Sequence, residues 1–175
     1  MKNTVQVVFF MTAMALLPSG SRAQDDTRLV NEGVVNAPID QVWAAFTTRE
    51  GLESWRAAHA KIELKIGGTM KIQVLAEGTI DDAKAVEYII LSYDPMRMLS
   101  LKVTKAPDVF PFPNAIKNIW TVFYFVPEGD KATRVREVSM GFGNDDESKR
   151  MLEYRLDAKI WLRLQERFAA KPDAK

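Results

Sequence analysis

The chain has 175 residues, of which 47% are hydrophobic, and its formal net charge is +1. This size and composition fit one globular domain with a substantial core. The absence of cysteine excludes disulfides, the single histidine excludes a multi-histidine metal site, and the balanced charge lacks the basic surplus of nucleic-acid binders. We therefore expect no metal, no cofactor and no nucleic-acid partner.

Residues 1–23 have the pattern of a secretory signal peptide. Lys2 supplies positive charge, and residues 5–17 form an apolar segment too short to span a bilayer comfortably. Ser21-Arg22-Ala23 offers small residues at the cleavage-site positions. We predict cleavage after Ala23, a single domain over residues 24–175, a secreted or periplasmic location and no membrane span after cleavage. The alternative is an uncleaved membrane anchor.

The domain is expected to begin with one strand and two short helices. Residues 27–36 alternate imperfectly between apolar and polar side chains, which predicts a strand. Ala37-Pro38 ends this strand, because proline is well tolerated in the first turn of a helix. An apolar face then predicts a short helix after Pro38, and Glu50-Gly51-Leu52 begins a second one.

From Ala60 onward the apolar residues recur at every second position. Strands are expected over residues 60–66 and 69–74, since alternation is typical of a half-buried strand. Gly67-Gly68 lies between them and suits a tight turn, because glycine adopts a positive φ without steric cost. This segment is therefore predicted to form a β-hairpin.

The strand pattern continues through the second half of the chain. Residues 86–93 and 98–104 form another pair, and residues 119–126 and 132–142 complete a total of about six or seven strands. Residues 105–118 contain three prolines and are expected to form a loop or a sheet edge. Hairpin connections imply an antiparallel sheet with helices on one face, which is the α+β class.

Residues 144–170 are expected to form one long helix. Asn144 is placed to cap it, Glu147 to complete a capping box, and Pro172 to end it. One broad face of this helix is apolar and must be buried; its residues are Met151, Tyr154, Ala158, Trp161, Leu164 and Phe168. We expect a curved sheet wrapped around this helix.

Several short motifs, in this order and spacing, resemble one known family. They are Asn36-Ala37-Pro38, Val42-Trp43, Phe46-Thr47, Gly51-Leu52, Trp55, Gly67-Gly68-Thr69, Trp120, Thr133-Arg134-Val135 and Gly141-Phe142-Gly143. Together they are similar to SRPBCC (START-like, helix-grip) domains, and most closely to the activator-of-Hsp90-ATPase-homologue-like and polyketide cyclase-like subgroup. The similarity covers roughly residues 27–168.

The resemblance implies a helix-grip fold, in which a curved antiparallel sheet holds a long C-terminal helix and leaves a cavity between them. Members of the family bind apolar small molecules such as lipids, polyketides or aromatic compounds. Some members are cyclases or dehydratases, and some act through other proteins. The family shares no single catalytic motif, so the resemblance assigns no catalytic residue.

Two residues are weak candidates for acid–base chemistry. His59 is the only imidazole and lies between the second short helix and the second strand, where a surface position is the simpler interpretation. Glu137 shares a face of the last strand with Val135 and Ser139. If that face lines the cavity, Glu137 could act as an acid or base. Alternation alone leaves open which face points inward.

Large aromatic residues are the candidates for contacting a ligand, because ligand sites are mostly apolar with a few polar groups. These residues are Trp55, Tyr88, Phe110, Phe112, Trp120, Tyr154 and Trp161. Phe110 and Phe112 lie in the proline-rich segment and are candidates for a gate. Ordinary core packing is the alternative for each of these side chains.

Three functions remain open from the sequence. The first is an exported binding protein for a hydrophobic small molecule, the second a cyclase- or dehydratase-like enzyme, and the third a protein-interaction module. The first is favoured over an enzyme because no catalytic machinery is evident. The strand at residues 119–126 is apolar on both faces, so a homodimer through one of them is a further hypothesis.

Overall fold

The structure is a computed structural model, and it describes residues 27–107, 109–156 and 160–169. Its elements follow the expected order of one strand, two short helices, further strands and C-terminal helices. The predicted signal peptide and Pro172 lie outside the described residues.

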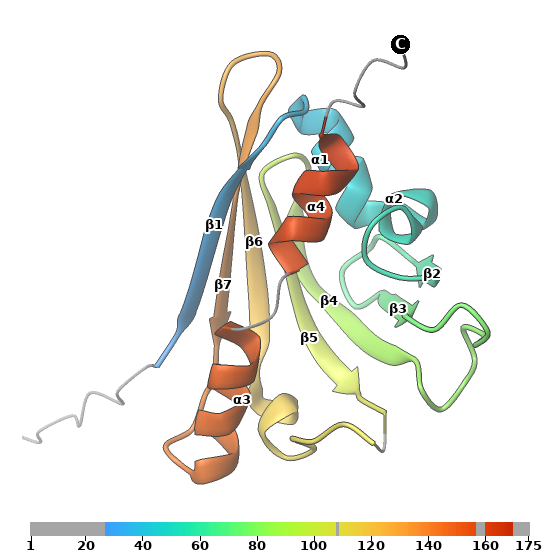
Figure 1. Ribbon diagram of the computed structural model, residues 1–175, viewed down its shortest axis with the longest axis vertical. Helices are drawn as coiled ribbons and strands as arrows, with labels where there is room; N and C mark the ends of the chain where they lie inside the picture. The colour runs from blue at the N-terminus through green and yellow to red at the C-terminus, as the bar shows by residue number, and fades with distance from the viewer. Residues whose placement is uncertain (1–26, 108, 157–159, 170–175) are drawn as a thin grey trace, which may run out of the picture.

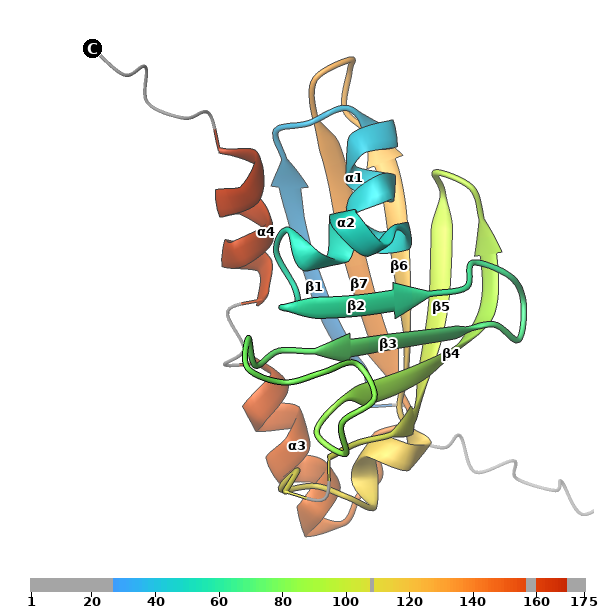
Figure 2. The same ribbon diagram turned by 90° about the vertical axis from the view of Figure 1, so that its right-hand side faces the viewer.

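Seven antiparallel strands form one curved sheet in the order β1-β7-β6-β5-β4-β3-β2. Their bounds are β1 (Leu29–Val35), β2 (His59–Ile62), β3 (Thr69–Gln73), β4 (Val86–Asp94), β5 (Met98–Lys105), β6 (Trp120–Pro127) and β7 (Thr133–Met140). Shifts of register between β4 and β5 bend the sheet, as β-bulges do. Figure 2 shows β2 and β3 running across the direction of β1, β7 and β6, so the sheet encloses one concave face. The predicted α+β helix-grip fold is confirmed.

Two short helices, α1 (Ile39–Thr47) and α2 (Arg49–Glu53), follow β1 and cover one end of this face. Helix α1 begins directly after Pro38, as expected. The Thr48 hydroxyl accepts a hydrogen bond from the Gly51 N–H at 2.9 Å and caps α2. A Cβ on Gly51 would lie 2.0 Å from the Ala44 carbonyl oxygen, so only glycine permits this tight junction.

The C-terminal segment differs from the prediction of one helix over residues 144–170. It contains α3 (Asp146–Leu156) and α4 (Ile160–Phe168), and residues 157–159, with Ala158, lie outside the described residues. Figure 1 shows α3 at the lower end of the sheet, beside the 3-10 helix η1 (Ala115–Asn118), and α4 higher up, beside β1. The predicted apolar face is buried only in part: Met151 and Leu164 are fully buried and Trp161 and Phe168 partly so, but Tyr154 is 53% exposed, which the prediction did not expect.

The predicted capping box is also wrong, because the cap lies one residue later than expected and Glu147 takes no part in it. Asp145, not Asn144, caps α3: its carboxylate accepts hydrogen bonds from the Ser148 N–H at 2.9 Å and the Ser148 hydroxyl at 2.7 Å. These bonds, the backbone one foremost, hold the pKa of Asp145 below its usual range. Glu147 is therefore free of the local cap and bonds to the proline-rich segment instead.

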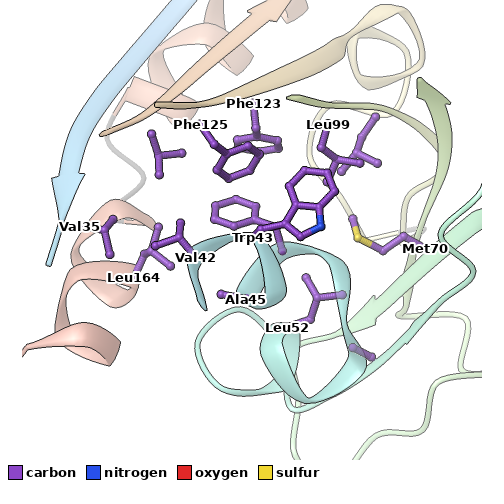
Figure 3. Close-up of a cluster of buried hydrophobic side chains, with 14 of the residues drawn as sticks. Val35, Val42, Trp43, Ala45, Leu52, Met70, Leu99, Phe123, Phe125 and Leu164 are labelled. Atoms are coloured by element: carbon purple, nitrogen blue, oxygen red, sulfur yellow. The ribbon is translucent and has the colours of Figure 1, made fainter. Parts of the chain in front are cut away.

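A dense hydrophobic core fills the end of the concave face beneath α1. Trp43 packs edge-on against Phe125 with ring centroids 5.4 Å apart, and Phe46 lies 5.1 Å from Phe123. Leu52 and Leu164, both fully buried, bring α2 and α4 into the same cluster (Figure 3). Each such side chain contributes about 1.5–3 kcal/mol by leaving water, so this core carries much of the stability.

A second and smaller cluster lies at the other end of the sheet. It joins Met151 of α3 to Ile116 of η1, to Ile119 and to Phe112 of the proline-rich segment. The two clusters share no buried residue, and residues of both line a cavity between them.

Candidate functional site

A cavity of about 450 Å³ lies between the two hydrophobic clusters. Small-molecule sites in proteins typically have volumes of roughly 300–1,000 Å³. Its walls include Phe46 and Phe123 from the first cluster and Ile116, Ile119 and Met151 from the second. The cavity therefore lies where the resemblance implies, and its volume is within the usual range for a ligand site.

Strand alternation explains why the walls are largely apolar. On β5 the side chains of Leu101 and Val103 line the cavity, and on β6 Thr121 and Phe123 do so. The residues between them point to the outer face of the sheet, since side chains alternate along a strand. On β7 the same alternation turns Glu137 inward. This answers the question that the sequence left open.

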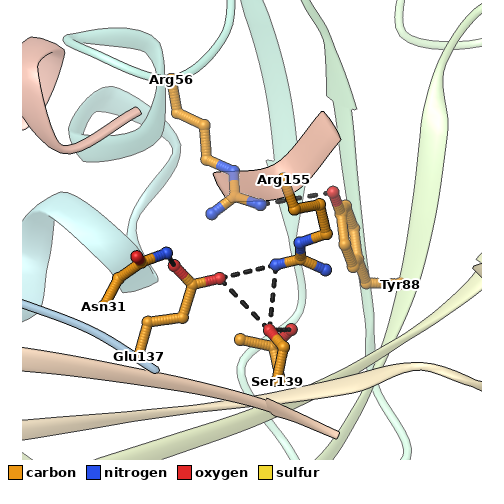
Figure 4. Close-up of polar contacts among 7 residues, drawn as sticks. Asn31, Arg56, Tyr88, Glu137, Ser139 and Arg155 are labelled. Carbon is orange, nitrogen blue, oxygen red and sulfur yellow. Dashed lines mark hydrogen bonds and ion pairs between the residues drawn. The ribbon is translucent and has the colours of Figure 1, made fainter. Parts of the chain in front are cut away.

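Glu137 is the centre of a polar network in the cavity wall, shown in Figure 4. Its carboxylate is almost fully buried and accepts hydrogen bonds from Arg155 Nη2 at 2.6 Å, Asn31 Nδ2 at 3.2 Å and the Ser139 hydroxyl at 3.3 Å. Arg155 Nη2 also donates to Ser139 Oγ at 3.0 Å. Glu137 is thus an ion-paired carboxylate that ties α3 to β7, and its surroundings are not apolar.

A second polar group, Arg56, enters the cavity from the loop after α2. Its Nη2 donates to the Tyr88 hydroxyl at 3.3 Å. Its guanidinium carbon lies 5.6 Å from the Tyr88 ring centroid and 5.8 Å from that of Trp55, which is cation–π range. The Trp55 indole is itself fixed by a hydrogen bond of 2.9 Å to the Ala45 carbonyl. Two aromatic rings therefore hold the Arg56 guanidinium in place.

The proline-rich segment closes one side of the cavity. Phe110, Phe112 and Tyr154 pack on one another with ring centroids 5.6–6.3 Å apart. Glu147 fastens the same segment to α3, because its carboxylate accepts from the N–H groups of Asn114 at 2.7 Å and Ala115 at 3.0 Å. Those backbone bonds, that of Ala115 foremost, hold the pKa of Glu147 below its usual range.

The structure brings together most of the aromatic residues singled out from the sequence. Trp55, Tyr88, Phe110, Tyr154 and Trp161 line the cavity. Phe112 does not, because it is buried in the second cluster. Trp120 does not either, because it lies on the outer face of β6, near Gly141. Whether the five lining residues contact a ligand stays a prediction.

His59 is not among the residues that line the cavity. It is the first residue of β2, and its Nε2 lies 3.1 Å from the Ala76 carbonyl oxygen. This agrees with the simpler interpretation of a histidine near the surface.

Sequence reasoning missed the arginines of the cavity, which are Arg56, Arg155 and the more exposed Arg163. Arg56 and Arg155 resemble ordinary solvated charges in the sequence, and only the fold brings them to Tyr88 and Glu137. The one local signal is that each follows an aromatic residue of the cavity, Trp55 and Tyr154 respectively.

The described residues contain neither a cluster of metal-binding side chains nor a helix suited to cross a membrane. No group of three or more His, Asp or Glu side chains within residues 27–107, 109–156 and 160–169 could hold a metal ion. Over the same ranges, no helix is both long and apolar enough to cross a membrane.

Solved structures with the same fold are distantly related in sequence. A protein of Mesorhizobium loti aligns with a TM-score of 0.62 and 17% identity over 81% of this chain and 96% of its own. The Aha1 dimer of Colwellia psychrerythraea aligns with a TM-score of 0.59 and 14% identity over 81% of this chain and 96% of its own. An HSP90 activator of Plasmodium falciparum aligns with a TM-score of 0.52 and 12% identity over 81% and 87%. At these identities the likeness shows the fold alone.

The sequence itself matches one family model. A comparison with curated proteins found no match. The model that matches residues 36–160 is described as Activator of Hsp90 ATPase homolog 1-like protein, and it extends from the residue after β1 to the first residue of α4. The chain belongs to the family of Activator of Hsp90 ATPase homolog 1-like proteins, within the SRPBCC superfamily.

Proposed function

We propose that the protein binds a hydrophobic small molecule, a lipid, polyketide or aromatic compound, in the cavity between the sheet and the C-terminal helices. The observation that supports this most directly is the cavity itself, about 450 Å³ with largely apolar walls. Folding normally fills such a space with side chains, because protein interiors are close-packed. A cavity kept open between two packed clusters is better explained by a ligand that fills it.

A pair of matched variants tests this proposal. Val103 of β5 lines the cavity, whereas Val126 of β6 is 51% exposed on the outer face of the sheet. Val103→Trp fills the cavity and is expected to weaken binding of an apolar fluorescent dye by more than about tenfold, or roughly 1.4 kcal/mol. Val126→Trp adds the same side chain outside the cavity and should leave dye binding unchanged. Equal binding by both variants, or no binding by the wild type, would overturn the proposal.

Native mass spectrometry of protein purified from its own host complements the dye assay. A co-purifying lipid, polyketide or aromatic compound is the expected result for a binding protein. The Val103→Trp variant, purified in the same way, should lose that compound.

We also propose that the protein is exported and that residues 1–23 are removed. The support is the charged, apolar and small-residue pattern of that segment. Sequencing the N-terminus of exported protein should find Gln24 first, and finding Met1 on exported material would refute the cleavage.

The enzyme alternative depends on Glu137. This carboxylate lines the cavity, but three hydrogen bonds, one of them from Arg155, already occupy it. That pattern favours a structural role over proton transfer. Were the protein a cyclase- or dehydratase-like enzyme, Glu137→Gln would abolish turnover without unfolding the chain, whereas a carrier would still bind its ligand.

The interaction alternative comes from the relative described as an HSP90 activator. For this chain, the proposed export argues against it, because envelope and extracellular spaces lack ATP and the cytosolic chaperone.

A further inference from the structure

Two N–H groups in the cavity wall have no hydrogen-bond partner among the described residues. They are Arg56 Nε and Trp161 Nε1, and both atoms are fully buried. Buried polar groups in native proteins are nearly always paired, because an unpaired one costs free energy. Arginine and the tryptophan indole can only donate hydrogen bonds. Both atoms therefore lack an acceptor within the described part of the chain, and both belong to residues that line the cavity.

A third buried donor without a partner among the described residues, Gln73 Nε2, does not belong to this site. Gln73 is not among the lining residues, and its side chain packs against Gly78, where a Cβ would lie 2.8 Å from that nitrogen. Gln73 therefore differs from Arg56 and Trp161, which both line the cavity.

The charges around the cavity indicate the sign of the missing group. Among the described residues, Arg56, Arg155 and Arg163 line it together with a single acid, Glu137. Glu137 is already paired with Arg155 at 2.6 Å. No carboxylate of the described residues forms an ion pair with Arg56, whose partners are the Tyr88 hydroxyl and two aromatic rings. Arg56 is half-buried and has no carboxylate partner among the described residues, so its charge favours an anion over a cation in the cavity.

We propose that the ligand is an apolar acid whose carboxylate pairs with Arg56 and accepts the Trp161 N–H, while its hydrocarbon body lies against Phe46, Leu101, Ile119 and Phe123. This inference rests on the proposed function and specifies the chemical class of its ligand. A carboxylate suits the site because a guanidinium edge binds its two coplanar oxygens. Trp161 lies just beyond residues 36–160, the range matched by the family model.

The test compares four probes that share one alkyl chain and differ in head group: dodecanoate, methyl dodecanoate, dodecylamine and dodecyl phosphate. Affinities are measured calorimetrically at neutral pH on the lipid-stripped protein, below the micelle concentration of each probe. We expect dodecanoate to bind at least about tenfold more tightly than its methyl ester, and dodecylamine to bind more weakly than the ester.

Variants assign the preference to the two donors. Arg56→Met keeps an unbranched side chain and should bind acid and ester within about twofold of each other. A native circular dichroism spectrum and a cooperative thermal unfolding transition show that the variant folds. Trp161→Phe keeps an aromatic ring without the N–H and should lose part of the preference. Arg136→Met removes the same charge from the outer face of β7 and should keep the full preference.

The outcomes separate this inference from the proposed function. Equal binding of dodecanoate and its ester by the wild type would overturn the inference and leave the proposed function standing. A preference for dodecylamine would overturn it as well, and so would a preference for dodecyl phosphate over dodecanoate. Failure of all four probes to bind would overturn both.

Discussion

The two ends of the concave face are held together by different kinds of contact, apolar packing at one end and more polar bonds at the other. Beneath α1, aromatic and aliphatic side chains meet directly, as Trp43, Phe125 and Leu164 do. Beside α3, polar groups hold the elements together to a greater extent: Arg155 pairs with Glu137, and Glu147 bonds to the backbone of the proline-rich segment. The cavity lies where the first kind of packing gives way to the second.

This difference indicates that the two ends of the sheet contribute differently to the stability of the fold. A close-packed core is costly to open, because side chains that are pulled apart leave voids between them. Hydrogen bonds and ion pairs near the surface exchange more readily for hydrogen bonds to water and contribute less net free energy. The α1 end is therefore expected to contribute more to stability than the α3 end.

The largest effect is expected from truncating the dense core. Phe125→Ala should lower the free energy of unfolding by about 3–5 kcal/mol, because Phe125 is 3% exposed and packs on both Trp43 and Phe46. Phe110→Ala, the same change in the proline-rich segment, should cost about 1–2 kcal/mol. Chemical denaturation measures the free energy of unfolding of both variants. Equal effects of the two substitutions would contradict the division between the two ends.

The next largest effect is expected at the ion pair that holds α3. Arg155→Met leaves Glu137 buried without its cation and should cost about 2–3 kcal/mol. The double variant Glu137→Leu/Arg155→Met removes both charges and should recover most of this stability, because an apolar pair needs no desolvation of ions. A double-mutant cycle from denaturation measures the coupling. Additive effects of Glu137→Leu and Arg155→Met would show that the pair contributes nothing specific.

The regular part of this fold could be predicted from the sequence because it depends on local patterns. Each of the seven strands overlaps a run of residues with a strand pattern, and Pro38 immediately precedes α1. The predictions that were wrong concern residues whose bonding partners lie far away in the chain. Glu147 looked like half of a capping box, yet it bonds to Asn114, 33 residues earlier.

The candidate site was predictable only in part, for the same reason. Alternation grouped Trp120 with one face of its strand and Glu137 with one face of another, but it could not say which face is concave. The sheet's curvature sends Trp120 outward and Glu137 inward. Arg56 and Arg155 gave no local signal of burial, since a long charged side chain is usually solvated.

A smaller effect, dependent on pH, is expected at Glu147. Because its pKa is lowered in the folded state, its bonds stabilise the fold above the unfolded-state pKa of about 4.3, and this stabilisation is lost as the pH falls through the lower folded pKa. Glu147→Gln should therefore be less stable than the wild type at neutral pH and nearly equal to it in strong acid.

A control on the same helix makes this prediction specific. Glu153 is exposed on α3, and no hydrogen bond to it is found among the described residues. Glu153→Gln should match the wild type in thermal unfolding at both pH values. A pH-independent destabilisation of Glu147→Gln would show that its charge is not what fastens the proline-rich segment.

The smallest effect on stability is expected on the outer face of the sheet, away from both ends of the concave face. Tyr124 and Val126 of β6 are 43% and 51% exposed there. If two copies associate through this face, sedimentation velocity should show a dimer for the wild type and a monomer for Tyr124→Arg. The substitution should change the unfolding free energy by no more than about 0.5 kcal/mol, because it alters an exposed side chain. A wild type that stays monomeric at high concentration would contradict association through this face.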